Sequence, residues 1–142
     1  MDSDIVIPEL EDLIDGVKRK IDIIKEYGPP ESIEIIMDTA EHALRKISEY
    51  IARCNIFGYT DMVFSTGLIC GDIGEIATTI RIGVETEKYR PCKKCSSKEI
   101  TEKYADLLTD LAVTIKTIVT VSSDLLKDNC CPRSEDELLK YV

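Results

Sequence analysis

Two cysteines separated by two residues stand in the basic stretch "RPCKKCSSKEI", residues 90–100. Such a CxxC pair can close a small disulfide, supply two thiolate ligands to a metal ion, or carry out redox catalysis. The cations Arg90, Lys93 and Lys94 favour the thiolate forms of Cys92 and Cys95, which oxidise easily. The βαβ pattern of thioredoxin-like proteins is missing. We therefore expect a structural disulfide or unreactive thiols, with metal binding as the first alternative and redox catalysis as the second.

The remaining residues offer little for catalysis. His42 is the single histidine, which removes the usual Ser/His and Cys/His nucleophile pairs. Thr39 stands three residues before it, where a di-iron bundle needs glutamate. Asp106 and Asp110 share one helix face away from the apolar seam, and we expect them to be solvated. No phosphate loop, dinucleotide fingerprint or zinc-finger spacing is present. The sequence therefore predicts a protein that is not an enzyme and that has no cofactor and no metal site.

Apolar residues spaced by three and four predict four long helices. The first predicted helix begins at Pro8 and stops at Gly28-Pro29-Pro30, and the second ends between Asn55 and Gly58. The third starts at a cap, Thr60 or Asp61, and ends between Gly83 and Thr86. The fourth starts at a capping box over residues 96–99 and continues for about 30 residues. Because the links are short, the fold class is all-α, an antiparallel four-helix bundle. Residues 1–142 form one domain, with a short amphipathic helix in the tail, residues 132–142.

Three glycines lie on one flank of the third predicted helix, at Gly67, Gly71 and Gly74. Each glycine inside a helix costs roughly 0.5 to 1 kcal/mol relative to alanine, so the group predicts a close backbone approach. We expect a neighbouring helix of the same bundle to fill this flank. A subunit contact or a ligand is the alternative.

Up-and-down threading decides which cysteines can meet. Cys54 comes to the same end of the bundle as Cys130 and Cys131, so we predict a disulfide between Cys54 and one of these two, if their α-carbons lie within roughly 7 Å. Cys92 and Cys95 lie about one helix length from that end, which excludes a four-cysteine zinc site in one chain if the last helix is continuous. Cys70 is expected to be a small core residue.

Composition places limits on environment and partners. The chain of 142 residues carries a net charge of -9 and has an acidic N-terminus where a signal peptide would be basic. Its apolar runs are shorter than a membrane span, so we expect a soluble, cytoplasmic protein. It contains 20 isoleucines, two asparagines and no glutamine, a composition typical of hyperthermophiles, in which intracellular disulfides occur. The negative charge disfavours direct binding to nucleic acid.

Charge is distributed unevenly along the chain. Residues 1–31 hold nine acids and four bases, whereas residues 88–98 hold five bases and no acid. The densest acidic cluster consists of Glu9, Glu11, Asp12 and Asp15. We predict that these carboxylates dock on a basic surface of a protein partner, and that Arg90, Lys93 and Lys94 orient the complex or mediate self-association. A solvated surface with a basic loop is the simpler interpretation.

In layout, length and composition, residues 8–127 resemble small cysteine-containing helical-bundle proteins encoded by viruses of hyperthermophilic archaea. One such group, from a two-tailed virus, includes an inhibitor of host RNA polymerase and a related virion protein. The resemblance implies an acidic bundle that occupies the basic DNA channel of the polymerase inside the host cell. A virion structural or assembly protein, with self-association through the glycine flank and the basic loop, and a thiol or metal module built on the CxxC pair are the alternatives.

Overall fold

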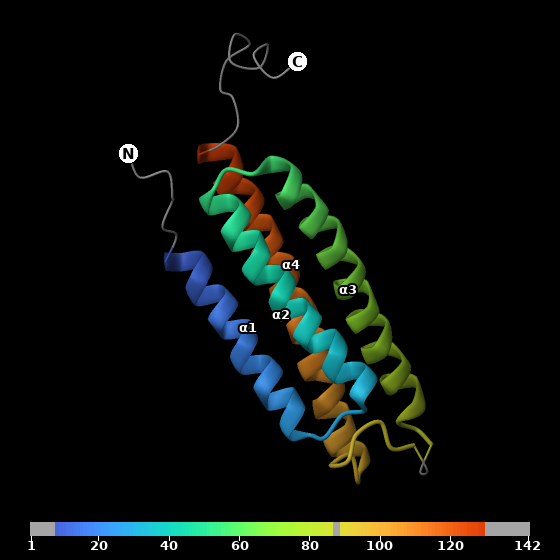
Figure 1. Ribbon diagram of the computed structural model, residues 1–142. Coiled ribbons are helices and arrows are strands. Elements are labelled where there is room, and N and C mark those ends of the chain that lie inside the picture. The colour runs from blue at the N-terminus through green and yellow to red at the C-terminus, as the bar shows by residue number, and fades with distance from the viewer. Residues whose placement is uncertain (1–7, 87–88, 130–142) are drawn as a thin grey trace.

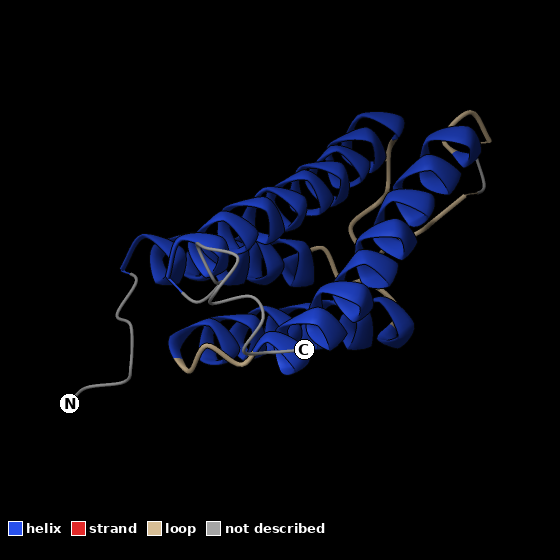
Figure 2. Ribbon diagram, turned by 90° about the horizontal axis from the view of Figure 1, so that it is seen from above, coloured by secondary structure: helices blue, strands red, loops and turns tan. Residues whose placement is uncertain are grey.

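The computed structural model describes residues 8–86 and 89–129 of the chain (Figure 1). Four helices make up this part: α1 (Pro8–Glu26), α2 (Glu31–Ala52), α3 (Ile56–Gly83) and α4 (Lys98–Asn129). Within the described ranges every regular element is a helix, as Figure 2 shows. The prediction of an all-α four-helix bundle is therefore confirmed. The predicted helix in the tail, residues 132–142, lies outside the described residues.

The helices do not contribute equally to the interior. α2 and α4 contact each other, and each of them also contacts both α1 and α3, whereas α1 and α3 do not touch. Figure 1 shows this arrangement, with α1 and α3 on opposite sides of the central pair. Each helix buries one apolar stripe in the shared core. The stripe of α1, for example, is at most 1% exposed at every position and consists of Leu10, Ile14, Val17, Ile21 and Ile24.

The connection between α2 and α3 is a Schellman motif. The N–H of Cys54 donates to the carbonyl oxygen of Ile51 (3.0 Å), and the N–H of Asn55 donates to that of Tyr50 (2.8 Å). Cys54 adopts a φ of 52°, the left-handed conformation for which glycine is usual at this position. Backbone geometry therefore does not explain why a cysteine occupies this position.

α3 begins earlier than the sequence pattern indicates. The side chain of Asn55 accepts a hydrogen bond from the N–H of Gly58 (2.9 Å) and so caps the helix. The prediction of a cap at Thr60 or Asp61 is wrong because Gly58 is not a helix breaker. It lies in the first turn of α3 against the Tyr50 ring, where a Cβ atom would stand 2.7 Å from ring carbons.

α4 is capped one residue later than predicted. The hydroxyl of Ser97 accepts a hydrogen bond from the N–H of Ile100 (3.2 Å), and the helix starts at Lys98. The N–H of Ser96 instead donates to the carbonyl oxygen of Lys94 (2.8 Å) within the turn around the CxxC pair. Glu99, the predicted partner in the box, forms an ion pair with Lys103 at 3.6 Å.

Tyr104 is among the largest fully buried side chains. Its ring lies 5.5 Å, between centroids, from that of Tyr27. Its hydroxyl group has no hydrogen-bond partner in the described structure. Burial, and to a smaller extent the neighbouring Tyr89, raises the pKa of Tyr104 to about 12.

We predict that Tyr104→Phe leaves stability at pH 7 unchanged or raises it by about 1 kcal/mol, because it removes a buried hydroxyl that has no partner. In the unfolded chain a tyrosine ionises near pH 10, below the folded pKa of about 12. The native protein should therefore lose stability as the pH rises from about 10 towards 12, and the variant should lose less. Urea unfolding at several pH values measures both effects, with Tyr50→Phe as the control. An equally steep alkaline loss in the Tyr104 variant would contradict the assignment.

Candidate functional site

Cys92 and Cys95 form a disulfide, with their α-carbons 5.1 Å apart. Both residues are buried, at 5% and 0% exposure. The loop that they close is fixed to the turn between α1 and α2: the N–H of Lys93 donates to the carbonyl oxygen of Gly28 (2.9 Å), and the N–H of Lys94 donates to that of Tyr27 (3.0 Å). The structure thus favours the structural disulfide among the predicted roles of the CxxC pair. We call this arrangement the disulfide clamp.

Gly28 is required at the clamp for two reasons. Its φ is +69°, a conformation that side chains other than glycine rarely adopt. A Cβ atom at this position would also stand 2.8 Å from the Cβ of Lys93. The disulfide uses both sulfurs of the pair, and among the described residues no group of three His, Cys, Asp or Glu side chains is placed to hold a metal ion.

The predicted basic residues surround the disulfide clamp. Arg90, Lys93 and Lys94 are all exposed. The Arg90 guanidinium donates to the carbonyl oxygen of Tyr89 (3.0 Å). Nearby, Lys98 and Glu85 form an ion pair of 3.0 Å, and this hydrogen bond raises the pKa of Lys98. The clamp therefore holds a cluster of cations at one end of the bundle.

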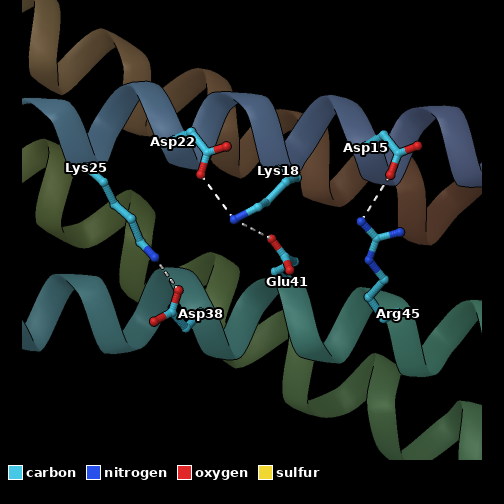
Figure 3. Close-up of polar contacts among 7 residues, drawn as sticks. All are labelled: Asp15, Lys18, Asp22, Lys25, Asp38, Glu41 and Arg45. Atoms are coloured by element: carbon cyan, nitrogen blue, oxygen red, sulfur yellow. Dashed lines mark hydrogen bonds and ion pairs between the residues drawn. The ribbon is translucent and has the colours of Figure 1, made fainter.

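The predicted acidic residues lie on the first two turns of α1. Glu9, Glu11, Asp12 and Asp15 are all exposed, around the buried Leu10. Asp15 forms an ion pair with Arg45 of α2 at 3.0 Å, as Figure 3 shows. The other three carboxylates form no ion pair with a described residue. We call Glu9, Glu11 and Asp12 the acidic end of α1.

Further along α1, Lys18 and Lys25 form ion pairs with carboxylates of α2. Lys18 pairs with Asp22 (3.1 Å) and with Glu41 of α2 (3.6 Å), and the hydrogen bond to Asp22 is the largest cause that raises its pKa (Figure 3). Lys25 pairs with Asp38. The charges of this row therefore pair with other described residues, whereas Glu9, Glu11 and Asp12 do not.

The two aspartates of α4 expected to be solvated are exposed but paired. Asp106 accepts a hydrogen bond from Arg81 of α3 (2.8 Å), and Asp110 pairs with Lys20 of α1. They link α4 to both outer helices. His42, expected at a surface or half-buried position, is exposed.

The predicted partner-binding residues do not form one surface. The acidic end lies at the beginning of α1, and the disulfide clamp contacts the turn that follows its last residue. The 19 residues of α1 separate the two groups by roughly 28 Å, at 1.5 Å per residue. A partner that contacts both must therefore span the length of the helix.

Sequence reasoning missed the outward face of α3. Phe57, Phe64 and Leu68 are 88%, 70% and 59% exposed. They recur at spacings of seven and four, like the predicted buried stripe, but on the opposite side of the helix. Within the described residues α3 is the one helix long and apolar enough to cross a membrane by length and composition. It contributes Tyr59, Ile73, Ala77 and Ile80 to the core.

The expectation that a neighbouring helix fills the glycine flank of α3 is wrong. A Cβ atom added at Gly67, Gly71 or Gly74 would meet no atom within 4 Å. α3 turns this flank away from α2, and a groove of about 370 Å³ lies beside it, between α3 and α4. Cys70, predicted in the core, lines this groove and is half-buried. Its thiol donates to the carbonyl oxygen of Ala112 (3.1 Å), and burial raises its pKa.

A second groove, of about 440 Å³, lies between α2 and α3 near the disulfide clamp. Ile33, Ile36 and Ile76 supply apolar surface, and Asp72 and Glu75 supply two exposed carboxylates. Both grooves border α3, which also carries five of the eight large exposed apolar side chains of the described residues, namely Ile56, Phe57, Phe64, Leu68 and Ile82.

Comparisons with models of protein families, with curated proteins and with solved structures find no match to this chain. Arguments about its function therefore depend on its own residues and geometry.

We predict that replacing Cys92 and Cys95 together by serine lowers the free energy of unfolding by about 2 kcal/mol, the entropic contribution of a very short closed loop. Urea unfolding of both proteins without reductant measures the difference. The N–H groups of Lys93 and Lys94 can still donate in the variant, so its helical circular dichroism should be unchanged. Equal stability of the two proteins would show that the backbone hydrogen bonds alone fix the loop.

Cys54 is itself disulfide-bonded. Its predicted partners, Cys130 and Cys131, lie outside the described residues. Its predicted pairing with Cys130 or Cys131 therefore stays a prediction. Such a bond closes a loop of roughly 76 residues and should contribute about 4 kcal/mol. Cys54→Gly keeps the left-handed turn without steric cost, so its stability loss reports on the disulfide. Peptide mapping without reduction should link the Cys54 peptide to the C-terminal one; a link to Cys70 would exclude the pairing.

Proposed function

We propose that this protein is a non-catalytic interaction protein whose acidic end of α1 binds a basic surface of a partner protein. The observation that carries the proposal is the contrast along α1. Glu9, Glu11 and Asp12 have no ionic partner among the described residues, whereas Lys18, Lys20 and Lys25 of the same helix pair with carboxylates of α2 and α4. These three carboxylates are thus available to an external partner.

The local structure supports this use. Leu10 and Ile14 are at most 1% exposed, so the acidic end is held on a helix whose other face is fixed in the core. Exposed charges presented on a rigid element steer a partner during encounter and suppress binding to surfaces of the same sign. They contribute less to final affinity than buried contacts do.

The resemblance to archaeal viral bundles suggests a specific partner, the RNA polymerase of the host. A channel that binds DNA must be basic, because phosphates are neutralised by Lys and Arg. An acidic bundle inside such a channel would block DNA and inhibit transcription without chemistry of its own. The protein would then act in the cytoplasm of the infected cell. A role in virion assembly is the second candidate, favoured by the exposed apolar face of α3.

The test removes three charges at one end of the molecule. We predict that Glu9→Gln, Glu11→Gln and Asp12→Asn together weaken partner binding at low salt and leave the helical spectrum intact, because exposed substitutions shift stability by about 0.5 kcal/mol each. Binding of the parent should also weaken as salt rises, since charges more than about 10 Å apart are screened at 0.1 M. Asp15 is kept because it pairs with Arg45.

The matched control is Glu26→Gln, Glu31→Gln and Glu102→Gln, which removes the same charge near the disulfide clamp. Binding is measured to RNA polymerase from a hyperthermophilic archaeon, and to proteins captured from host lysate. If both triple variants bind as tightly as the parent, the acidic end is not the binding surface. If the control weakens binding more, the surface lies at the clamp.

A further inference from the structure

The outward face of α3 combines large apolar side chains with empty space. Phe64 and Leu68 are mostly exposed, and Gly67 and Gly71 lie on the same face, one turn away, with nothing within 4 Å of an added Cβ. The ten residues from Met62 to Gly71 carry no charge. A continuous exposed apolar patch of this kind indicates an interaction site.

A second feature of this region is a buried polar group in the groove next to the outward face of α3. Thr66 lines the groove and is fully buried, and its hydroxyl has no hydrogen-bond partner in the described structure. Thr60 and Thr78 of the same helix instead donate to the carbonyl oxygen four residues earlier. A buried polar group without a partner is unusual and calls for a specific explanation.

We propose that two copies of this chain associate through the outward faces of their α3 helices, packed antiparallel about a two-fold axis. Such an interface uses the same patch twice, so the patch must complement itself: if residue i contacts residue j, then j contacts i. A patch that consists only of large side chains does not meet this condition. The face of α3 meets it because it carries both large side chains and glycines.

One register of the two antiparallel α3 helices matches both the sizes and the charges of the residues that face each other. When Phe64 lies opposite Gly71 of the second copy, Leu68 lies opposite Gly67, so both of these large side chains meet a glycine, while Phe57 lies opposite Thr78. In the same register Glu75 lies opposite Thr60, and no acid faces another acid on this face. In a parallel pair, Phe64 would meet Phe64 and Glu75 would meet Glu75, which is unfavourable in both size and charge.

A second copy fits this face better than a lipid surface does. Asp61, Asp72 and Glu75 border the apolar residues, and the chain carries a net charge of -9, which opposes approach to anionic membranes. Lipid tails also need no glycines on the helix that they cover. The face is separate from the acidic end of α1, because α1 and α3 lie on opposite sides of α2 and α4.

The chain allows variants that disturb the dimer without disturbing the monomer. Gly71→Leu adds a side chain where the monomer has open space, and leucine favours the helix more than glycine does. Phe64→Ser removes a side chain that is 70% exposed. Ile35→Ser, on the exposed side of α2 and 57% exposed, is the matched control.

Analytical ultracentrifugation over a range of chain concentrations is the experiment. The parent should be dimeric at about 100 µM, and Gly71→Leu and Phe64→Ser should each weaken association by about tenfold or more, while Ile35→Ser leaves it unchanged. Thr60→Lys, which places a cation opposite Glu75 twice per dimer, should strengthen association, and Thr60→Glu should weaken it. The proposal is overturned if the parent is monomeric at this concentration, or if the substitutions at Gly71 and Phe64 leave the dimer dissociation constant unchanged. If both Thr60 variants dimerise with the same dissociation constant as the parent, the antiparallel register is wrong.

Measurements at different salt concentrations and with lipid vesicles distinguish a second copy from the other possible occupants of the outward face of α3. Apolar association should persist or strengthen between 0.05 and about 1 M salt, opposite to binding through the acidic end. The Glu9, Glu11 and Asp12 variant should dimerise normally, so loss of partner binding and loss of dimer are independent results. If the parent is monomeric but binds neutral phosphatidylcholine vesicles, and Phe64→Ser abolishes that binding, lipid rather than a second copy covers α3.

Discussion

The packing of α2 against α4 is the interaction on which the rest of the structure depends. These two helices contact each other and both outer helices, whereas α1 and α3 do not touch. Each outer helix therefore buries one face against the same central pair and leaves its other face outside the core. Because the outward faces are not needed for the core, their chemistry can differ. One outer helix starts with carboxylates that have no ionic partner among the described residues, and the other carries exposed phenylalanines.

The disulfide clamp restrains the connection between α3 and α4, which the packing of the helices does not itself fix. The connection from α3 to α4 is the longest in the described chain, and ordering such a segment costs conformational entropy at each residue. A short cross-link and two backbone hydrogen bonds to the turn after α1 limit its freedom. The clamp thus connects the chain between α3 and α4 to the end of α1, although the two outer helices are apart. It also holds its exposed cations on a fixed backbone.

The seams were predictable from sequence because spacing by three and four is a property of a single helix. The five apolar residues that α1 spaces by three and four, Leu10, Ile14, Val17, Ile21 and Ile24, are all buried, as are Tyr104, Leu108 and Leu111 of α4, which follow the same spacing. Helix ends were less predictable, because neighbouring residues compete for the same cap. Asn55 caps α3 in place of Thr60, and Ser97 caps α4 because the CxxC turn engages Ser96.

The candidate surfaces were predictable to different degrees for the same reason. The exposure of Glu9 follows from its place beside the seam of α1, whereas its lack of an ionic partner within residues 8–86 and 89–129 depends on where α2 and α4 lie. Apolar residues occur on every side of α3, so its pattern could not show which face turns inward. Its sequence pattern predicts the glycines in the interior and gives no prediction for Phe57 and Phe64. Only the tertiary structure separates the two faces.

The two outward faces also differ in what they require. Carboxylates are well hydrated, so the acidic end is stable in water whether or not it binds a partner. Phe57 and Phe64 gain little from folding, and single exposed apolar residues are common, but a patch along successive turns of one helix favours being covered. Because the faces lie on opposite sides of the bundle, both can be occupied at once. A dimer built on α3 would carry two acidic ends, and a partner with two basic patches could then bind it bivalently, at a higher effective concentration than a monomer offers.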